Sequence, residues 1–348
     1  MRSTLALASV VAALAVWGCG GGSGTPAKTA GAAAKKDGAP VKVGLLLDNL
    51  HERWARDRDM IDEVVTDMGG ELVVATADSD QARQIQQAEK MLADGVKAII
   101  IVAHDTDKAA EIVDKAFAKN VPVIAYDRLI RNADVALYIG FDVKRVGELQ
   151  AAHLLAAAPK GNYILIGGSP TDGNAKILRE AQMKVLAPEI KKGAVKIVAD
   201  GWATDWTADA AAKITEQGLA KGKGQVAAVV ASNDVTAGGA IRVLEANGLA
   251  GKVAVSGQDA ELDAARRIVA GTQTMTVYKS LRTMTRLAAR NAVLLAKGEK
   301  LDVVATVNNG KRDVPTMMFD PIAVNAENLD GLLIGDGFLK RADVYGKK

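Results

Sequence analysis

Short apolar runs alternate with longer segments of helical period through most of the chain beyond residue 40. The continuous apolar run Val41–Leu47 predicts a buried strand, whereas the segment Asp80–Asp94 places Ile85, Ala88 and Met91 on one face of a helix. Regular alternation of buried strands and amphipathic helices is typical of βαβ units with a parallel sheet. The pattern therefore predicts an α/β fold.

This alternation restarts near residue 143, so the predicted elements fall into two halves of similar build. A chain of 348 residues is long enough for two cores of ordinary domain size. We therefore expect two doubly wound parallel-sheet lobes. The first half contains expected strands at 41–47, 71–75, 98–102, 122–125 and 137–140 and helices at 54–68, 80–94 and 108–119. The second contains strands at 163–166, 195–199, 227–230, 253–256 and 274–277 and helices at 143–158, from 174, at 208–219, 237–247 and 262–269. A helix at 281–297 and irregular or short β segments complete the chain.

The first 18 residues have the pattern of a signal peptide. Arg2 supplies a positive charge, and the apolar run from Leu5 to Trp17 is too short to span a bilayer as a mature helix. The run ends in Val-Trp-Gly-Cys, which resembles a lipoprotein cleavage box, although Trp17 stands where a small residue is usual. These residues predict that the chain is exported.

Cys19 is the only cysteine, so the folded part cannot contain an intramolecular disulfide. It directly follows the apolar run and precedes residues rich in Gly, Ala and Lys without apolar periodicity, which favours a flexible tether over residues 19–40. We expect lipidation of Cys19 and anchoring in the cell envelope. The alternative is an incidental cysteine in a signal peptide that is cut elsewhere.

The composition argues against several classes of function. The net charge is +3, and Lys and Arg are scattered among 41 acidic residues, so no nucleic-acid footprint is visible. The three histidines have no ligand-like spacing, and no P-loop, dinucleotide fingerprint or nucleophile elbow is present. We therefore expect no metal, no cofactor and no enzymatic activity.

Polar residues follow the predicted strands at their carboxyl ends, where open α/β sheets bind ligands. This set consists of Asp, Asn, Arg, Lys and Trp, which suits a neutral polyol, because paired polar groups match vicinal hydroxyls and an indole covers the apolar face of a sugar ring. The segments are 48–54, 126–128, 167–174, 202–206, 232–234, 258–259 and 278–279.

Each of these positions also has a purely structural interpretation, but their joint placement after successive strands favours a shared binding site. The structural alternatives are N-caps or loop acids for Asp127 and Asp234, a helix cap for Asn174, surface charges for Arg53 and Lys279, and core positions for Trp54 and Trp206.

Over residues 41–339 the sequence resembles the D-xylose-binding periplasmic protein family, type I sugar-binding receptors of ABC importers. Gly-Gln-Asp and Ser-Asn-Asp elements recur across ribose-, galactose- and xylose-type relatives, whereas Glu-Arg-Trp together with Tyr-Asp-Arg favours xylose. The segments that carry the resemblance are 52–54, 57–59, 125–128, 147–150, 167–170, 174–176, 231–234, 237–240, 256–260 and 271–279. The stretch from Asp48 to Glu52 is shorter than is usual in the family.

The resemblance implies a type I periplasmic-binding-protein fold, with residues 41–142 plus 280–319 in an N-terminal lobe and 143–279 plus 320–348 in a C-terminal lobe. Three crossovers near Asp142, Lys279/Ser280 and 319–322 would form the hinge. It also implies a sugar held by a particular set of residues, with the two tryptophans stacking on its ring faces. That set is Arg53, Trp54, Asp127, Arg128, Asn174, Trp206, Asn233, Asp259 and Lys279.

The sequence therefore predicts a monomeric exported protein that captures a monosaccharide, D-xylose, and delivers it to an ABC permease in the membrane. One alternative is a sensor that presents another pentose or hexose to a membrane signalling protein. A transcriptional regulator of the same fold would need a helix-turn-helix where this chain has its signal peptide and tether. A glycosidase would need two carboxylates, nominally Asp127 and Asp259, but cations such as Arg128 would keep both ionised.

Overall fold

The computed structural model describes residues 39–346, and Pro40–Lys348 form one compact unit. Predictions that concern the signal peptide, Cys19 and most of the tether lie outside the described residues. Between residues 39 and 346, no helix combines the length and the apolar character that a bilayer crossing needs.

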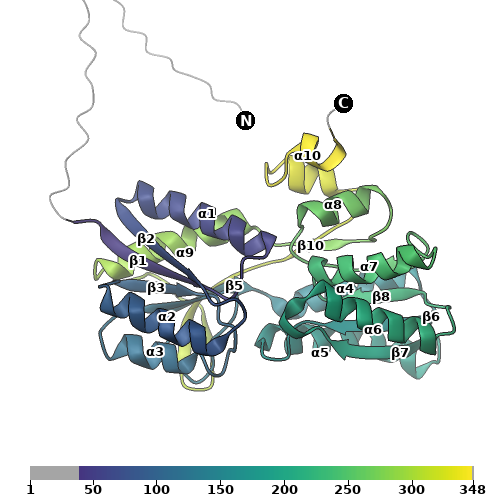
Figure 1. The fold of residues 1–348 in the computed structure, drawn as a ribbon, viewed down its shortest axis with the longest axis horizontal. Helices are drawn as coiled ribbons and strands as arrows, with labels where there is room; N and C mark the ends of the chain where they lie inside the picture. Colours follow the sequence, from purple (N-terminus) through teal and green to yellow (C-terminus); the bar gives the residue numbers. More distant parts are fainter. Residues whose placement is uncertain (1–38, 347–348) are drawn as a thin grey trace, which may run out of the picture. The chain divides into compact units, whose positions relative to one another are not determined.

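The larger sheet has seven strands in the order β11-β12-β5-β4-β3-β1-β2 (Figure 1). All its pairings are parallel except that of β11 with β12. The pattern predicted irregular or short β segments after residue 297, but β12 is seven residues long and pairs in parallel with β5. The strands are β1 (Val41–Leu47), β2 (Gly70–Thr76), β3 (Ala98–Ile101), β4 (Val123–Tyr126), β5 (Leu137–Phe141), β11 (Thr306–Asn308) and β12 (Asp313–Phe319).

A second sheet of four parallel strands has the order β7-β6-β8-β9, and β10 and β13 form a separate antiparallel pair. The edge strand β9 has only two residues, although four were expected. Parallel sheets alternating with helices confirm the predicted α/β class. These strands are β6 (Gly161–Gly167), β7 (Val195–Trp202), β8 (Ala228–Ala231), β9 (Ala254–Val255), β10 (Thr276–Tyr278) and β13 (Ile322–Val324).

Most helices begin and end within a few residues of the predicted bounds. The largest difference is at the start of α7, which begins at Asp234 rather than at residue 237, because Asn233 and Thr236 form a capping box there. The helices are α1 (Glu52–Asp67), α2 (Gln81–Ala93), α3 (Ala110–Phe117), α4 (Val143–Ala157), α5 (Gly173–Lys191), α6 (Ala208–Lys221), α7 (Asp234–Ala246), α8 (Leu262–Val269), α9 (Leu281–Ala296) and α10 (Arg341–Tyr345), with shorter turns η1 (Thr204–Trp206) and η2 (Asp330–Ile334).

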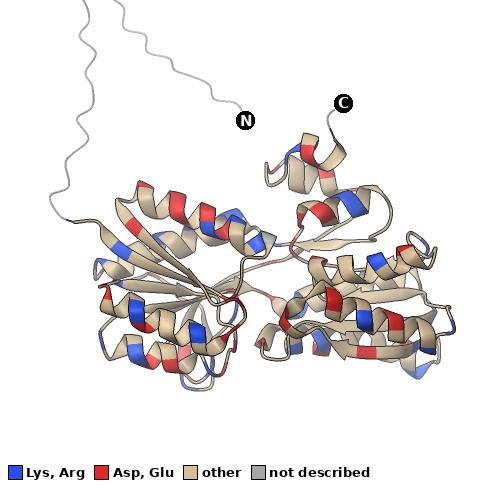
Figure 2. Ribbon diagram, in the orientation of Figure 1, with Lys and Arg blue, Asp and Glu red and all other residues tan. Residues whose placement is uncertain are grey.

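The larger sheet is covered on both faces, with α1 and α9 on one face and α2 and α3 on the other (Figure 1). Consecutive residues of β1 point to opposite faces of the sheet and enter different cores. Leu45 packs in the cluster of α1 and α9, and Leu46 in that of α2 and α3. Strand β3 is buried along its whole length, as expected of a strand covered on both sides. The outer faces of these helices carry Lys and Arg interspersed with Asp and Glu (Figure 2).

The chain passes between the sheets three times. It leaves the seven-stranded sheet after β5 at Asp142, returns through Lys279 and Ser280 before α9, and leaves again between β12 and β13. The strands on either side of these passages fall within the residue ranges expected for the two lobes. The division into lobes with a moving hinge stays a prediction.

Candidate functional site

The nine predicted site residues all line one cavity. Its free space is about 630 Å³, a volume that includes the open mouth. The residues come from the ends of different elements: α1 supplies Arg53 and Trp54, and the turn after β4 supplies Asp127 and Arg128. The others are Asn174, Trp206, Asn233, Asp259 and Lys279.

Asp127 lies in the turn after β4, with a left-handed backbone conformation of φ 66°. Its carboxylate is 2.5 Å from Arg53 Nη2 and 3.6 Å from Lys279 Nζ, and Asn174 Nδ2 donates to it at 3.3 Å. Burial opposes ionisation, but the Arg53 and Lys279 cations prevail and hold the pKa of Asp127 below its usual range. The carboxylate is therefore ionised and accepts hydrogen bonds only.

Asp259 lies in the turn between β9 and α8 and shares the same two cations. Its Oδ1 accepts from Arg53 Nη1 at 3.2 Å and lies 2.8 Å from Lys279 Nζ. Two acids that come from strand ends of different sheets are thereby joined through one guanidinium and one ammonium. This arrangement leaves carboxylate lone pairs at the cavity wall for further donors.

Arg53 is held from behind by Asp57, one turn further along α1. Its Nε is 3.6 Å from Asp57 Oδ2, which also accepts from the Tyr126 hydroxyl at 2.8 Å. Burial raises the pKa of Asp57 to about 6, against the opposing effect of Arg53. The Arg53 guanidinium lies 4.1 Å from the Trp54 ring centroid, so the cation also contacts an aromatic face.

Arg128 bridges two buried acids. Nη1 donates to Asp48 Oδ2 at 2.9 Å, and Nε is 2.8 Å from Asp172 Oδ2. Asp48 is also 2.8 Å from His104 Nδ1. Although burial alone would lower it, Asp172 and Asp48 raise the pKa of Arg128 above its usual value. The cation therefore stays charged and is paired with both acids.

Two buried indoles line the cavity, Trp54 at 6% exposed and Trp206 at 7%. Trp206 has φ 59° and packs against Gly168 so closely that a Cβ there would lie 2.1 Å from the ring. Only glycine leaves room for the indole at this position. Among the described residues, the buried Nε1 of Trp206 finds no hydrogen-bond partner.

The structure decides between several of the alternatives that the sequence left open. Arg53 and Lys279 are buried, so the surface interpretation is wrong for both. The N-cap of α5 is Asp172 rather than Asn174. Asn233 lines the cavity and also caps α7 through Oδ1, whereas Asp234 is the first helical residue and lies outside the lining. Trp54 and Trp206 take part in hydrophobic clusters as well as in the cavity wall.

Sequence reasoning missed most of the apolar wall. Phe141, at the end of β5, lies beneath the Lys279 ammonium at 5.2 Å, and its position directly after a predicted strand was the signal that could have identified it. Glu261 was missed as well. Of the polar residues after strands, His51 also lines the cavity, and burial lowers its pKa. The remaining lining residues outside the predicted set are Asn49, Val143, Val146, Asp172, Leu178, Val235 and Gln258.

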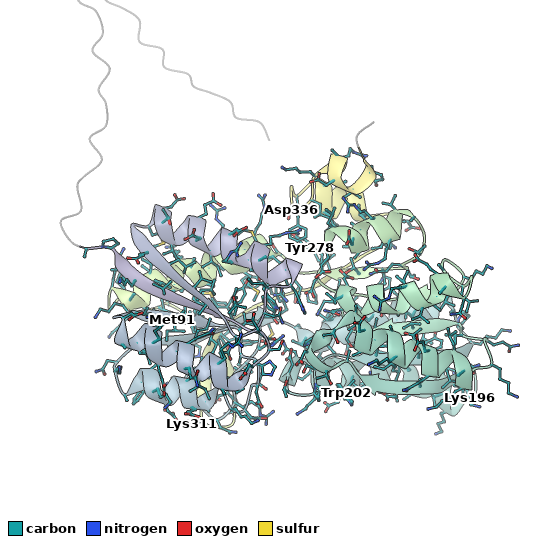
Figure 3. The ribbon with its side chains drawn as sticks, viewed as in Figure 1. Met91, Lys196, Trp202, Tyr278, Lys311 and Asp336 are labelled. Atoms are coloured by element: carbon teal, nitrogen blue, oxygen red, sulfur yellow. The ribbon has the colours of Figure 1, made fainter. Side chains whose placement is uncertain are left out.

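Trp202 and Tyr278 belong to the polar segments after strands but do not line the cavity. Trp202, at the end of β7, is 39% exposed and lies 5.2 Å from the Arg179 guanidinium (Figure 3). Tyr278 precedes Lys279, and its hydroxyl donates to Asp336 at 2.6 Å (Figure 3). Consecutive residues of an extended segment point to opposite sides, which explains why Tyr278 faces away while Lys279 reaches the cavity.

The cavity is polar but nearly balanced in charge. The three lining cations, Arg53, Arg128 and Lys279, each lie beside one or more carboxylates. A charged ligand would have to displace one of these buried pairs, which is costly, whereas hydroxyl groups can add to them. Within residues 39–346, no cluster of three or more His, Cys, Asp or Glu is arranged to hold a metal ion. The site therefore suits a small neutral polyol.

Two sheets with a polar cavity at their strand ends define a solute-binding protein, and comparison with known proteins agrees. The family described as periplasmic binding protein domain matches residues 43–300. The chain belongs to the periplasmic binding protein family.

Its curated relatives confirm the resemblance seen in the sequence. The D-xylose-binding periplasmic protein of Haemophilus influenzae is 46% identical over 306 residues, covering 88% of this chain and 92% of the relative. The protein of the same description from Escherichia coli is 44% identical over 305 residues, covering 87% and 92%. A solved carbohydrate transporter solute-binding protein from Chloroflexus aurantiacus, in complex with D-glucose, has a TM-score of 0.80 at 30% identity and covers 87% of this chain and 97% of that one.

Proposed function

We propose that this protein captures a monosaccharide, D-xylose, and delivers it to an ABC importer in the membrane. The observation that carries the proposal is the pair of acids, Asp127 and Asp259, joined through Arg53 and Lys279 at a cavity lined by two indoles. The two curated relatives described as D-xylose-binding proteins support the choice of sugar.

Each predicted residue has a role in this proposal. Asp127 and Asp259 accept from sugar hydroxyls, while the cations and the amides of Asn174 and Asn233 donate to hydroxyl and ring oxygens. Trp54 and Trp206 cover the two apolar faces of the ring. The acids and cations are buried and orient one another, so they present fixed donors and acceptors to the sugar.

The two lobes close on the sugar about the three crossovers, and the closed monomer docks on the permease. Arg128 supports this step, because it pairs with Asp48 of the expected N-terminal lobe and with Asp172 of the expected C-terminal lobe. The protein has no catalytic role in this scheme, so the sugar leaves the site chemically unchanged.

Export and a lipid anchor at Cys19 complete the proposal. The anchor would hold the binding protein near its permease through the tether of residues 19–40. Mass spectrometry of the mature N-terminal peptide tests this part: a diacylated or triacylated Cys19 is expected, and an unmodified N-terminus at another residue would contradict it.

Isothermal titration calorimetry of the purified protein against D-xylose, D-ribose, L-arabinose and D-glucose tests the function. We expect the tightest binding for D-xylose. Failure to bind any pentose would overturn the proposal, and recovery of the sugar unchanged after incubation tests the absence of catalysis.

A further inference from the structure

Asp234 is fully buried at the start of α7, behind the turn 257–261 that carries Asp259. It does not line the cavity and is not one of the nine predicted site residues. Among the described residues no cation contacts its carboxylate oxygens, although Arg267 Nη2 donates to its backbone carbonyl at 2.9 Å. A buried carboxylate without a contacting cation is costly to keep in a protein interior.

The turn in front of Asp234 has a strained backbone. Asp259 and Ala260 are consecutive non-glycine residues in left-handed conformations, with φ 101° and 53°. Such residues are energetically unfavourable and persist only where surrounding contacts hold them. The turn therefore needs specific support to present Asp259 to Arg53 and Lys279.

The carboxylate of Asp234 supplies that support at three points. Its Oδ2 accepts from the backbone N–H of Glu261 at 3.1 Å and from the Thr276 hydroxyl at 2.8 Å. Its Oδ1 accepts from Gln273 Nε2 at 2.8 Å. The Thr276 hydroxyl accepts in turn from the backbone N–H of Ala260 at 3.2 Å, so both residues that follow Asp259 are tied to the carboxylate.

Two further features show how closely the turn fits this acid. The backbone N–H of Asp234 donates to the Gln258 carbonyl at 3.0 Å. A Cβ at Gly257 would lie 1.9 Å from Asp234 Oδ1, so residue 257 must be glycine for the turn to wrap around the carboxylate. The residues on both sides of Asp259 are therefore hydrogen-bonded: Gln258 before it, and Ala260 and Glu261 after it.

We propose that Asp234 is a positioning residue that holds Asp259 in the orientation required for sugar binding. This inference rests on the proposed function, because it assigns a support to one of the proposed ligand-binding acids. The hydrogen bonds to Asp234 Oδ1 and Oδ2 come from Glu261, Gln273 and Thr276. The support therefore needs an ionised carboxylate, which accepts at both oxygens.

Proton uptake gives this role a measurable signature. Burial, reinforced by the neighbouring Asp259, raises the pKa of Asp234 to about 7, while Arg267 of α8 and the hydrogen bonds from Gln273 and Thr276 oppose the rise. A protonated Asp234 presents an O–H among donors and supports the turn less well. Sugar affinity then falls as the pH decreases below about 7. This loss of affinity is smaller in a variant that lacks the titrating acid.

The main test compares the wild-type protein with Asp234→Asn, which keeps the shape and replaces an acceptor with an NH₂ donor. We expect D-xylose affinity to fall about 10-fold or more at pH 8, as for an unpaired buried group, and to become less dependent on pH. The matched control is Ile241→Val in the same helix, which lowers stability in the adjacent core without touching the turn. Unchanged affinity in Asp234→Asn, or an equal loss in Ile241→Val, would overturn the inference.

A second pair of variants covers the case in which Asp234→Asn does not fold. Thr276→Val removes the hydroxyl that links Ala260 to Asp234 and should weaken binding in the same direction, whereas Thr276→Ser keeps the hydroxyl and should restore affinity. Equal affinities in the two variants would contradict the linkage.

A crystal structure of Asp234→Asn, or of Thr276→Val, separates this inference from the proposed function, because it needs no sugar. The inference requires the turn to leave its left-handed conformation or Lys279 Nζ to separate from Asp259. An unchanged turn would refute it whatever the protein binds.

Discussion

Two acids that line the cavity, Asp127 and Asp259, lie in turns whose strained backbones are supported in different ways. Asp127 and Asp259 both have positive φ angles and both contact Arg53. The turn of Asp127 is supported by neutral neighbours: its backbone N–H donates to the Ile139 carbonyl at 2.8 Å, and the Tyr138 hydroxyl donates to its carbonyl at 3.1 Å. The turn of Asp259 has a similar backbone bond, from its N–H to the Val277 carbonyl at 2.9 Å, but in addition it encloses a buried acid, Asp234.

The sheets explain the difference. Strand β4, which leads to Asp127, lies between β3 and β5, so neighbouring strands fix the chain on both sides as the turn begins. Strand β9, which leads to Asp259, is a two-residue strand at a sheet edge and offers little ladder to continue. A strained turn at such an edge needs a local anchor, and a carboxylate with several lone pairs can gather more backbone and side-chain donors than a hydroxyl can.

The largest effect is expected from Asp259→Ala. Removing this carboxylate leaves Arg53 and Lys279 short of a buried partner, which costs about 3–5 kcal/mol, so D-xylose affinity should fall more than 100-fold. Calorimetry measures the loss. The control is Asp263→Ala on α8, where an exposed acid pairs with the exposed Arg266. Equal affinity in wild type and Asp259→Ala would contradict the claim that the Asp259 turn contributes to sugar binding as the Asp127 turn does.

Gly168→Ala tests the aromatic wall that lies between the turns. The new Cβ would overlap the Trp206 ring, and overpacking of this kind costs about 1–3 kcal/mol, so affinity should fall about 10-fold. Gly331→Ala is the control, since no atom lies within 4 Å of a Cβ there and its φ is not positive. Retained affinity in Gly168→Ala would show that the Trp206 position is not needed for binding.

A pH series compares two buried acids that contact or support site residues, Asp57 beside Arg53 and Asp234 behind Asp259. Burial raises the pKa of Asp57 from 3.8 to about 6, so the folded protein binds this proton more tightly than the unfolded chain does. Stability from that proton is present below pH 4 and is lost as the pH rises through about 6, an effect on the order of 1–3 kcal/mol.

Urea unfolding at pH 4.5 and 7.5 measures this effect. Asp234 contributes with the same sign, so the difference between wild type and Asp57→Asn isolates Asp57. We expect the wild-type free energy of unfolding to fall more steeply with rising pH than that of Asp57→Asn. Parallel profiles would show that Asp57 stays ionised beside Arg53 throughout.

The smallest effect is expected from Tyr138→Phe, which removes the neutral support of the Asp127 turn. Loss of one hydrogen bond of about 1 kcal/mol predicts a several-fold weaker affinity, a smaller loss than in Thr276→Val, which acts on the Asp259 turn from β10. Tyr163→Phe is the control, because its hydroxyl bonds Leu154 and Ala158 within a separate core. A larger loss in Tyr138→Phe than in Thr276→Val would reverse the comparison between the turns.

The sequence predicted the α/β class and most elements because hydrophobic period follows directly from burial on one or two faces. It also predicted that residues such as Arg53 and Lys279 meet, although 226 positions separate them, because strand ends of open sheets converge. It could not show that both are buried between shared carboxylates, since a charged residue in a polar segment has the same pattern on a surface. Asp234 illustrates the remaining limit. Its support of Asp259 depends on backbone angles and on donors from Glu261, Gln273 and Thr276, which no local pattern encodes.

A crystal structure of the protein grown with D-xylose tests the central claim most directly. The account predicts one sugar ring between Trp54 and Trp206, with hydroxyl groups within hydrogen-bond distance of the Asp127 and Asp259 carboxylates. An empty cavity at saturating D-xylose, or a sugar bound without contact to either carboxylate, would contradict it.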